Sequence, residues 1–305
     1  MIVVGGFNSS IDKLADIDRL EAGTVMRLRN VRSSPGGKGA HVALACATLG
    51  EPATLVGLID RRHRSDFDRV LSRAGVAFAS IEVEESIRTC LALGDADGRT
   101  SELLEPGPLV PPDVAASLTD RFIAESRAAG IAVLSGSLPS GFESETYARL
   151  IRAAGCRVLL DASGDLLAAS LAARPFAVKP NRDEAARLVG FRVDSWEAAG
   201  RAAAAIAARG PEIVIVSLGA DGAVAHVSGR ACRIKAPTVD VRNAVGAGDC
   251  LLAGFAVGLV RGWPLEECVR AGVACGSAKA VHPDTGTLRA ADVDRLLPSV
   301  AIEWV

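Results

Sequence analysis

The stretch Asn243–Cys250 combines glycines and an aspartate directly before a run of apolar residues. Gly246 and Gly248 flank Ala247, and Asp249 follows them. Glycines allow the backbone to present bare N–H groups, which bind anions at the start of a helix. The pattern fits an anion hole for a migrating phosphoryl group, with Asp249 as the general base. The alternative is a tight turn in which Asp249 only caps the helix.

A second glycine-rich stretch, Pro35–Gly39, contains Lys38 and precedes the alanine-rich segment 40–49. Backbone N–H groups at a helix start, together with a lysine, suit a phosphate group. The stretch is not a P-loop, because Gly39 follows Lys38 and Arg32 stands where the first glycine is required. A purely structural glycine turn before a helix is the alternative.

A third group of polar residues, Lys179, Asn181 and Glu184, follows the short apolar run 176–178. Asn181 and Glu184 are three positions apart, so they share one face of a helix that begins there. An amide and a carboxylate on one face suit hydrated Mg²⁺ with a nucleotide phosphate, since Mg²⁺ keeps several waters and takes few protein ligands. The alternative is a capping box, with Asn181 as the cap and Glu184 closing it.

Short apolar runs alternate with alanine- and leucine-rich segments of helical period along most of the chain. This alternation predicts an α/β fold with a mostly parallel sheet and helices on both faces. Ligands bind such sheets at the loops that follow the carboxyl ends of the strands. The expected strands are 2–4, 54–59, 131–134, 158–160, 176–178 and 213–216, and the clearest helical segments are 112–129, 144–154 and 195–208.

Residues 12–34 and about 86–106 interrupt this alternation, because they contain mixed polar and apolar runs without a long helical pattern. We expect extended strands there, forming an antiparallel sheet added to the core. The chain shows no internal repeat or flexible linker, so residues 1–305 are expected to form one domain with a small excursion.

The overall composition excludes several classes of protein. The 305 residues carry 34 basic and 36 acidic side chains, so charge gives no argument for nucleic-acid binding. No charge-free apolar stretch reaches the roughly 18 residues of a membrane span. The 7 cysteines are scattered and include no Cys-x-x-Cys pair, and the N-terminus lacks a charged leader, which predicts a cytoplasmic protein.

Taken together and in chain order, these motifs resemble the ribokinase-like PfkB carbohydrate kinases. Matching motifs run from Gly-Gly-Lys-Gly through Ser-Gly-Ser-Leu-Pro-Ser-Gly, Leu-Asp-Ala-Ser-Gly, Lys-Pro-Asn-x-x-Glu and Ser-Leu-Gly-x-x-Gly-Ala to Gly-Ala-Gly-Asp. The similarity is greatest to the phosphosugar branch, which contains 1-phosphofructokinase and tagatose-6-phosphate kinase. It rests on Pro35–Gly39, Arg27, Arg88 and Glu105–Pro108.

The resemblance implies a three-layer ribokinase-like fold with a small β-sheet lid, through which two copies form a homodimer. It implies that Asp249 is the catalytic base and that the backbone of residues 246–248 is the anion hole. It assigns the phosphorylated sugar to Asp12, Arg27, Gly37, Lys38, His41, Arg88 and Ser137. It assigns ATP to Lys179, Asn181, Ser217, Gly219, Gly222 and Gly248, and Mg²⁺ to Glu184.

The implied reaction is ATP-dependent phosphorylation of the free primary hydroxyl of a ketohexose monophosphate, namely fructose 1-phosphate, giving fructose 1,6-bisphosphate. The alternatives are a tagatose-6-phosphate or fructose-6-phosphate kinase, a kinase for an unphosphorylated sugar or nucleoside, and a non-catalytic sensor on the same scaffold. Four departures from the family pattern bear on the ligands. His41 and Leu104 stand where relatives usually have Asn, the segment 58–63 lacks the usual glycines, and Lys279 replaces a small or amide residue near the adenine pocket.

Overall fold

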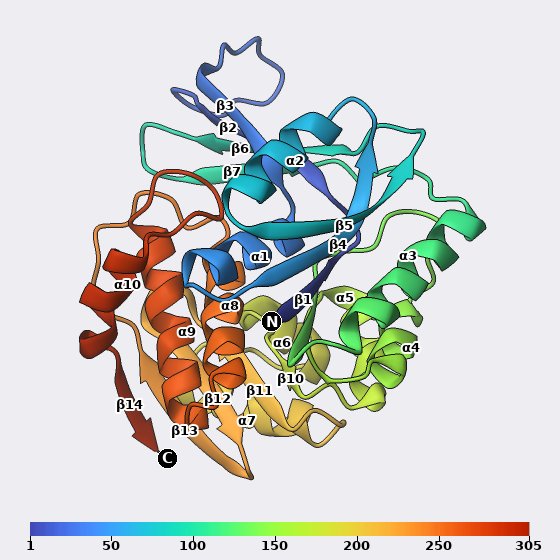
Figure 1. Cartoon of the computed structure of the whole chain (residues 1–305). Coiled ribbons are helices and arrows are strands. Elements are labelled where there is room, and N and C mark those ends of the chain that lie inside the picture. The colour runs from blue at the N-terminus through green and yellow to red at the C-terminus, as the bar shows by residue number, and fades with distance from the viewer. Residues whose placement is uncertain (305) are drawn as a thin grey trace.

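The computed structural model describes residues 1–304, and a ten-stranded sheet forms its centre (Figure 1). From β5 to β11 all neighbouring strands are parallel, and three antiparallel strands extend the sheet beyond β11. In spatial order the strands are β5 (Val76–Val83), β4 (Ala53–Asp60), β1 (Ile2–Gly6), β8 (Ile131–Ser135), β9 (Arg157–Asp161), β10 (Ala177–Val178), β11 (Ile213–Ser217), β12 (Gly222–Val227), β13 (Arg230–Lys235) and β14 (Ala301–Trp304).

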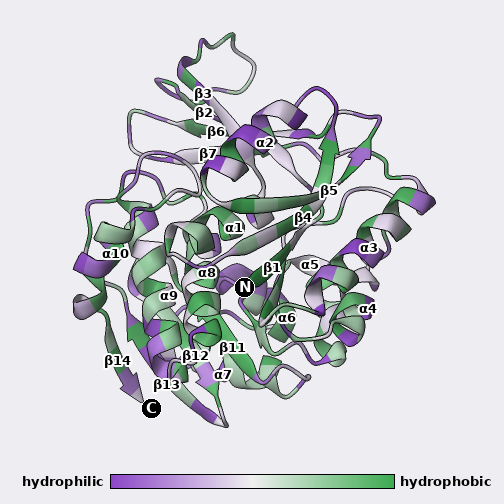
Figure 2. Ribbon diagram, in the orientation of Figure 1, coloured by the Kyte–Doolittle hydropathy of each residue, from purple (hydrophilic) through white to green (hydrophobic). Residues whose placement is uncertain are grey.

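The central strands are almost completely buried because helices cover both faces of the sheet. Every residue of β1, β4 and β8 is buried, and Figure 2 shows β1 as a hydrophobic ribbon in the middle of the molecule. Period-two alternation is absent from such strands, since neither face meets water. The predicted α/β class and its mostly parallel sheet are therefore confirmed.

Two series of helices enclose this sheet. On one side α1 packs against α8, α8 against α9, and α9 against α10; on the other, α3 to α7 follow one another in contact. No helix in residues 1–304 is long and apolar enough to cross a membrane. The helices are α1 (Lys38–Thr48), α2 (Arg64–Arg73), α3 (Pro112–Ser126), α4 (Thr146–Ala153), α5 (Gly164–Ser170), α6 (Arg182–Val189), α7 (Trp196–Ala207), α8 (Ala247–Val260), α9 (Leu265–Ala280) and α10 (Ala290–Leu296).

A second, four-stranded sheet lies apart from the main one, at the top of Figure 1. Its strands, in spatial order, are β3 (Arg29–Gly36), β2 (Ser10–Asp16), β6 (Arg88–Gly94) and β7 (Thr100–Leu104). The expectation of a purely antiparallel sheet is wrong, because β2 and β6 are parallel. The physical reason is connectivity: β2 continues from β1 and β6 from β5, and these two strands of the main sheet point the same way.

Candidate active site

A cavity of about 660 Å³ opens at the carboxyl ends of the main-sheet strands and extends to the small sheet. The start of α1, the start of α8 and the loops after β9, β10 and β11 all contribute to its wall. Most of the residues singled out from the sequence meet here. Those lining the cavity are Asp12, Gly37, Lys38, His41, Arg88, Ser137, Lys179, Asn181, Glu184, Ser217, Gly219, Gly246, Ala247, Gly248 and Asp249.

The wall of the cavity contains two carboxylates joined by an imidazole, which we call the carboxylate cluster (Asp12, His41, Asp249). His41 Nδ1 lies 2.8 Å from Asp249 Oδ2, and His41 Nε2 lies 2.9 Å from Asp12 Oδ2. The three side chains are only 7–10% exposed. Ser10 Oγ donates to Asp12 Oδ1 at 2.6 Å, so Asp12 is also fixed from its own strand. The carboxylate of Asp249 therefore contacts a side chain from another helix, which helix capping alone does not explain.

Glycines on three different segments make room for this cluster. A Cβ on Gly36 would lie 2.1 Å from Asp12 Cγ, and one on Gly286 would lie 2.2 Å from the His41 ring. A Cβ on Gly246 would lie 2.6 Å from the Gly286 Cα atom. The backbone thus approaches the ionised side chains more closely than any larger residue permits, which restricts their positions.

The two carboxylates keep the imidazole of His41 protonated. Burial alone would lower the pKa of His41, but its hydrogen bonds and charge attraction to Asp12 and Asp249 raise that pKa to about 10. Burial would likewise raise the pKa of Asp12, yet His41 and Ser10 hold it below its ordinary value. The cluster therefore carries two negative charges and one positive charge at neutral pH.

The reverse arrangement, two cations around one carboxylate, lines the same cavity. We call it the lysine cluster (Lys38, Asp161, Lys179). Lys38 Nζ lies 3.3 Å from Asp161 Oδ1, and Lys179 Nζ lies 3.2 Å from Asp161 Oδ2. The second contact is ionic rather than a well-aligned hydrogen bond, since Oδ2 has no hydrogen-bond partner of acceptable geometry among the described residues. The side chain of Asp161 is only 1% exposed, whereas the side chain of Lys38 is 41% exposed.

The mutual attraction within the lysine cluster fixes its ionisation. The charge of Asp161 raises the pKa of Lys38. Burial would raise the pKa of Asp161, but Lys179 and Lys38 together hold it below its ordinary value. One positive charge is left uncompensated, and it belongs to groups that can meet an anion entering the cavity.

Helix α8 starts between the two clusters. Gly246 precedes it in the left-handed region, with φ of 87°. The Ala247 N–H donates to the Ala244 carbonyl at 3.0 Å, whereas among described residues the N–H groups of Gly248 and Asp249 have no carbonyl acceptor. Lys179 Nζ would lie 3.1 Å from a Cβ on Gly248. An anion at this helix start would thus meet two N–H groups, the positive end of a helix and a lysine.

The segment after β10 forms the capping box considered as an alternative from the sequence. Asn181 Oδ1 accepts from the Glu184 N–H at 2.8 Å, and Glu184 Oε2 accepts from the Asn181 N–H at 2.9 Å. Asn181 also forms an isolated bridge with Ser217, which brings the loops after β10 and β11 together. Because Asn181 and Glu184 line the cavity as well, capping does not remove them from the site.

Two of the expected site residues do not line the cavity. Arg27 lies exposed on the loop between β2 and β3. Gly222 is the first residue of β12. Its φ of 113° favours glycine, and a Cβ there would lie only 2.1 Å from the Ile234 carbonyl oxygen, so the local backbone explains this glycine without a ligand. By contrast, Arg88 lines the cavity, and the carbonyls of Asn8 and Glu105 orient its guanidinium at 3.3 and 3.4 Å.

Sequence reasoning did not assign three acids that the structure brings to the cavity, namely Glu102, Asp161 and Asp183. Asp161 is the last residue of β9, and its position after an apolar strand was the available signal. Glu102 comes from β7 of the small sheet, and no motif marked it. Burial and the charges of Asp12 and Asp249 raise the pKa of Glu102, as expected for a carboxyl group near the carboxylate cluster.

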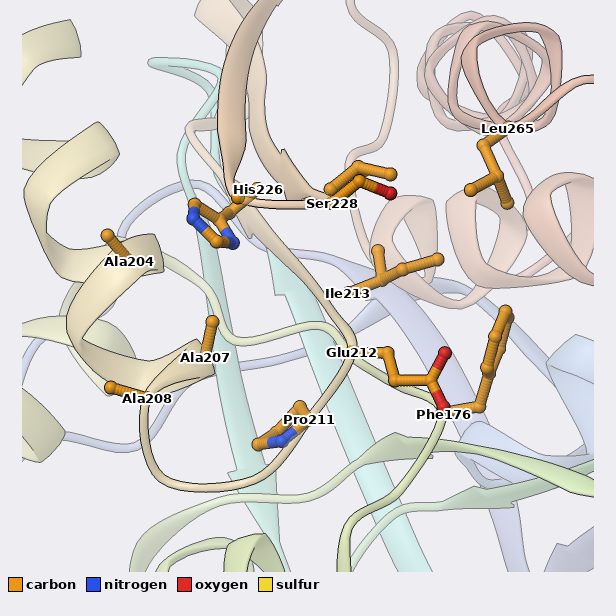
Figure 3. A pocket seen from close by; sticks show the side chains of 12 residues that line it. Phe176, Ala204, Ala207, Ala208, Pro211, Glu212, Ile213, His226, Ser228 and Leu265 are labelled. Carbon is orange, nitrogen blue, oxygen red and sulfur yellow. The ribbon is translucent and has the colours of Figure 1, made fainter.

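A second hollow of about 490 Å³ lies at the amino end of β11, beside the end of β12 (Figure 3). Its wall is mostly apolar and includes Phe176, Ile213 and Leu265. The polar side chains labelled in Figure 3 are Glu212, His226 and Ser228. Neither cluster reaches it. The chemistry therefore belongs to the larger cavity.

Comparison with known proteins gives one consistent result. The family model for the pfkB family carbohydrate kinases matches residues 3–291. The chain is 33% identical to 1-phosphofructokinase of Xanthomonas campestris pv. campestris over 91% of this chain and 92% of that protein. It is 28% identical to tagatose-6-phosphate kinase of Staphylococcus epidermidis over 99% of both chains.

A solved structure shares the fold over nearly the whole length. Phosphofructokinase-2 from Escherichia coli in complex with substrates and products superposes with a TM-score of 0.91, at 30% identity and over 98% of both chains. The same bacterial protein has been solved in complex with potassium and in a tetrameric inhibited form.

Proposed function

The chain belongs to the pfkB family of carbohydrate kinases, and we propose that it phosphorylates the free primary hydroxyl of a ketohexose monophosphate, with fructose 1-phosphate as its substrate. The observation that supports this proposal is that one cavity is lined by a cluster with excess negative charge and a cluster with excess positive charge. A hydroxyl that must lose a proton fits the carboxylate cluster, and phosphate groups fit the lysine cluster with Arg88.

Asp249 is the general base in this proposal. It accepts the proton of the attacking hydroxyl, which requires an approach of roughly 2.6–3.2 Å. His41 holds the carboxylate at one oxygen, Oδ2, so that the other oxygen faces the substrate. Phosphoryl transfer through a loose transition state needs the proton removed late, so a modest base suffices. The N–H groups of Gly248 and Asp249 receive the oxygens of the migrating phosphoryl group.

The phosphate already on the sugar is assigned to Lys38 and Arg88, with the backbone of Gly37 and the hydroxyl of Ser137 beside them. Lys38 is free to move toward a ligand because 41% of its side chain is exposed. Ser137 Oγ accepts from Asn8 Nδ2 at 3.0 Å, which leaves its own hydroxyl hydrogen for an acceptor. An unphosphorylated sugar would leave these cations without a partner.

ATP enters from the opposite side in this proposal, over Lys179, Asn181, Ser217 and Gly219. Glu184 fits a hydrated Mg²⁺, since only its Oε2 is used by the capping box. Residues 1–304 hold no group of three or more His, Cys, Asp or Glu side chains arranged for a metal ion. A chain with few ligands of its own suits Mg²⁺ that arrives on the nucleotide phosphates with its waters. The ion would neutralise charge on those phosphates.

We also propose that the small sheet is a lid and that two copies of the chain associate through it in the cytoplasm. Large apolar side chains are exposed on this sheet and its loops, including Val25 (89%), Val31 (53%) and Leu104 (59%). Exposed apolar side chains gathered in this way are typical of contact surfaces. Light scattering should give a dimer for the wild type and a smaller species for Val31→Glu; a monomeric wild type would contradict the proposal.

The substrate is tested by measuring ADP release with fructose 1-phosphate, fructose 6-phosphate, tagatose 6-phosphate, free fructose and ribose. We expect the largest kcat/KM with fructose 1-phosphate. A preference for another ketohexose phosphate would move the chain to the tagatose-6-phosphate or fructose-6-phosphate alternative. Preference for a free sugar or nucleoside, or binding without ADP release, would overturn the proposal.

A further inference from the structure

Lys279, in the last turn of α9, is completely buried, with 0% of its surface exposed. Its Nζ donates to the backbone carbonyl of Asn243 at 2.6 Å and to that of His282 at 3.2 Å. Both partners are neutral carbonyls. A buried ammonium is usually paired with a carboxylate. The burial of Lys279 among neutral carbonyls therefore calls for a separate explanation.

The two carbonyls belong to the two loops that support the start of α8. The first loop runs from Asn243 to Gly246, and the second contains His282 and Gly286. The loops also contact each other directly: Asn243 Nδ2 donates to the Pro283 carbonyl at 3.0 Å, and the Gly286 N–H donates to the Val245 carbonyl at 3.1 Å. Lys279 thus ties together the segments that position Gly246 and, through Gly286, the ring of His41.

The side chain of Lys279 is charged at neutral pH. Burial lowers its pKa to about 8, which is still above 7, while the nearby Cys250 and Asp284 act in the opposite direction. The carboxyl end of α9 adds the negative end of a helix dipole. A single positive charge surrounded by backbone carbonyls is the environment that proteins use for monovalent cations, where carbonyl oxygens replace the hydration shell.

We propose that the ammonium of Lys279 acts as a built-in monovalent cation that holds the two loops of the anion hole in place. The lysine is therefore a positioning residue and makes no contact with substrate. The chain works without added potassium or ammonium, and removal of the side chain creates a site for such an ion. The activity part of this inference rests on the proposed function, whereas the binding part does not.

The test compares two variants of the full chain in buffers of equal ionic strength that contain tetramethylammonium, potassium or ammonium chloride. Lys279→Ala removes the charge and leaves a space lined by carbonyls. Lys279→Met removes the charge but fills the space with an unbranched apolar chain. Lys235→Ala, at an exposed lysine of β13, is the surface control. Thermal midpoint and the rate of ADP release are both measured.

We expect wild type and Lys235→Ala to change less than about twofold in rate between the three salts. In tetramethylammonium, Lys279→Ala should lose about tenfold in rate, the worth of one charge-assisted hydrogen bond. Potassium or ammonium should restore its rate and raise its thermal midpoint in a saturable manner. Lys279→Met should be impaired in all three salts.

Three results would overturn the inference: several-fold activation of the wild type by potassium, full activity of Lys279→Met, or a Lys279→Ala variant that no cation stabilises. If neither variant folds, the response of the wild type to the three salts decides. If the wild type phosphorylates no sugar, the thermal midpoints still decide, so failure of the proposed function is distinguishable from failure of this inference.

Discussion

The two ionic clusters use the same parts in opposite proportions. The lysine cluster places two cations on one buried carboxylate, and the carboxylate cluster places two carboxylates on one buried imidazolium. Each leaves one unit of charge uncompensated, positive in the first and negative in the second. Because they share one cavity, a substrate that carries both an anion and a hydroxyl can be oriented by charge before any chemistry occurs.

The clusters also differ in freedom to move. All three side chains of the carboxylate cluster are at most 10% exposed, whereas Lys38 of the lysine cluster is 41% exposed. A rigid cluster suits a base whose position determines the rate, and a partly mobile one suits the capture of an incoming phosphate. Substitutions in and beside the two clusters should therefore have effects of very different size.

Asp249→Asn should lower kcat by about 10²–10⁴-fold, the usual contribution of a general base, because the amide cannot accept the proton of the hydroxyl. The Kd for ATP should stay within about threefold, since the lysine cluster is untouched. Stopped-flow binding and steady-state rates measure both quantities. Asp165→Asn, at another aspartate in the first turn of a helix, is the matched control and should be unaffected. A near-normal kcat for Asp249→Asn would remove Asp249 from the mechanism.

Lys179→Met should lower the free energy of unfolding by on the order of 3 kcal/mol, because it takes a 5% exposed partner from the buried Asp161. Lys38→Met should cost no more than about 1 kcal/mol, since its ion pair is partly solvated. Urea titrations of the two variants give both values. Equal losses for the two lysines would contradict the different environments assigned to them.

His41→Asn should change how stability depends on pH. The folded-state pKa of His41, about 10, lies above its ordinary value of 6.5. The stabilisation is therefore complete below pH 6.5 and is lost as the pH rises toward 10, at up to about 1.4 kcal/mol per pH unit. Between pH 7 and 9.5 the wild type should lose more stability than the variant in urea titrations. Parallel pH profiles would mean that the imidazole is not held as a cation.

Arg32→Ala should have the smallest effect, within about 0.5 kcal/mol of stability. Its partner, Asp284, is 2.6 Å away, but both side chains are about half exposed. The pair joins β3 of the small sheet to the loop that contains Gly286. A large rise in the KM for sugar phosphate in this variant would show that the ion pair is needed for substrate binding, which its exposure does not lead us to expect.

Local patterns in the sequence predicted the mostly parallel character of the main sheet and six of its ten strands. Strands such as 213–216 were recognisable because they are apolar on both faces. The strands β5, β12, β13 and β14 were not singled out; β5 and β13 contain partly exposed residues, and β14 has only four residues. Most of the motif residues do line one cavity. The contact of His41 with Asp249 could not be predicted, because it joins residues 208 positions apart. From the sequence, His41 was expected to contact the sugar and was noted as a departure from the usual Asn, but its carboxylate partners were not foreseen.

The division of labour between the clusters is tested most directly by one ratio, the kcat/KM for fructose 1-phosphate divided by that for free fructose. The wild type should favour the phosphorylated sugar by at least about a hundredfold, the effect of two charge-assisted contacts. In the double variant Lys38→Met/Arg88→Met the ratio should fall toward one, because only the phosphorylated sugar loses its partners. An equal loss for both sugars, with the ratio unchanged, would contradict the assignment of Lys38 and Arg88 to the sugar phosphate.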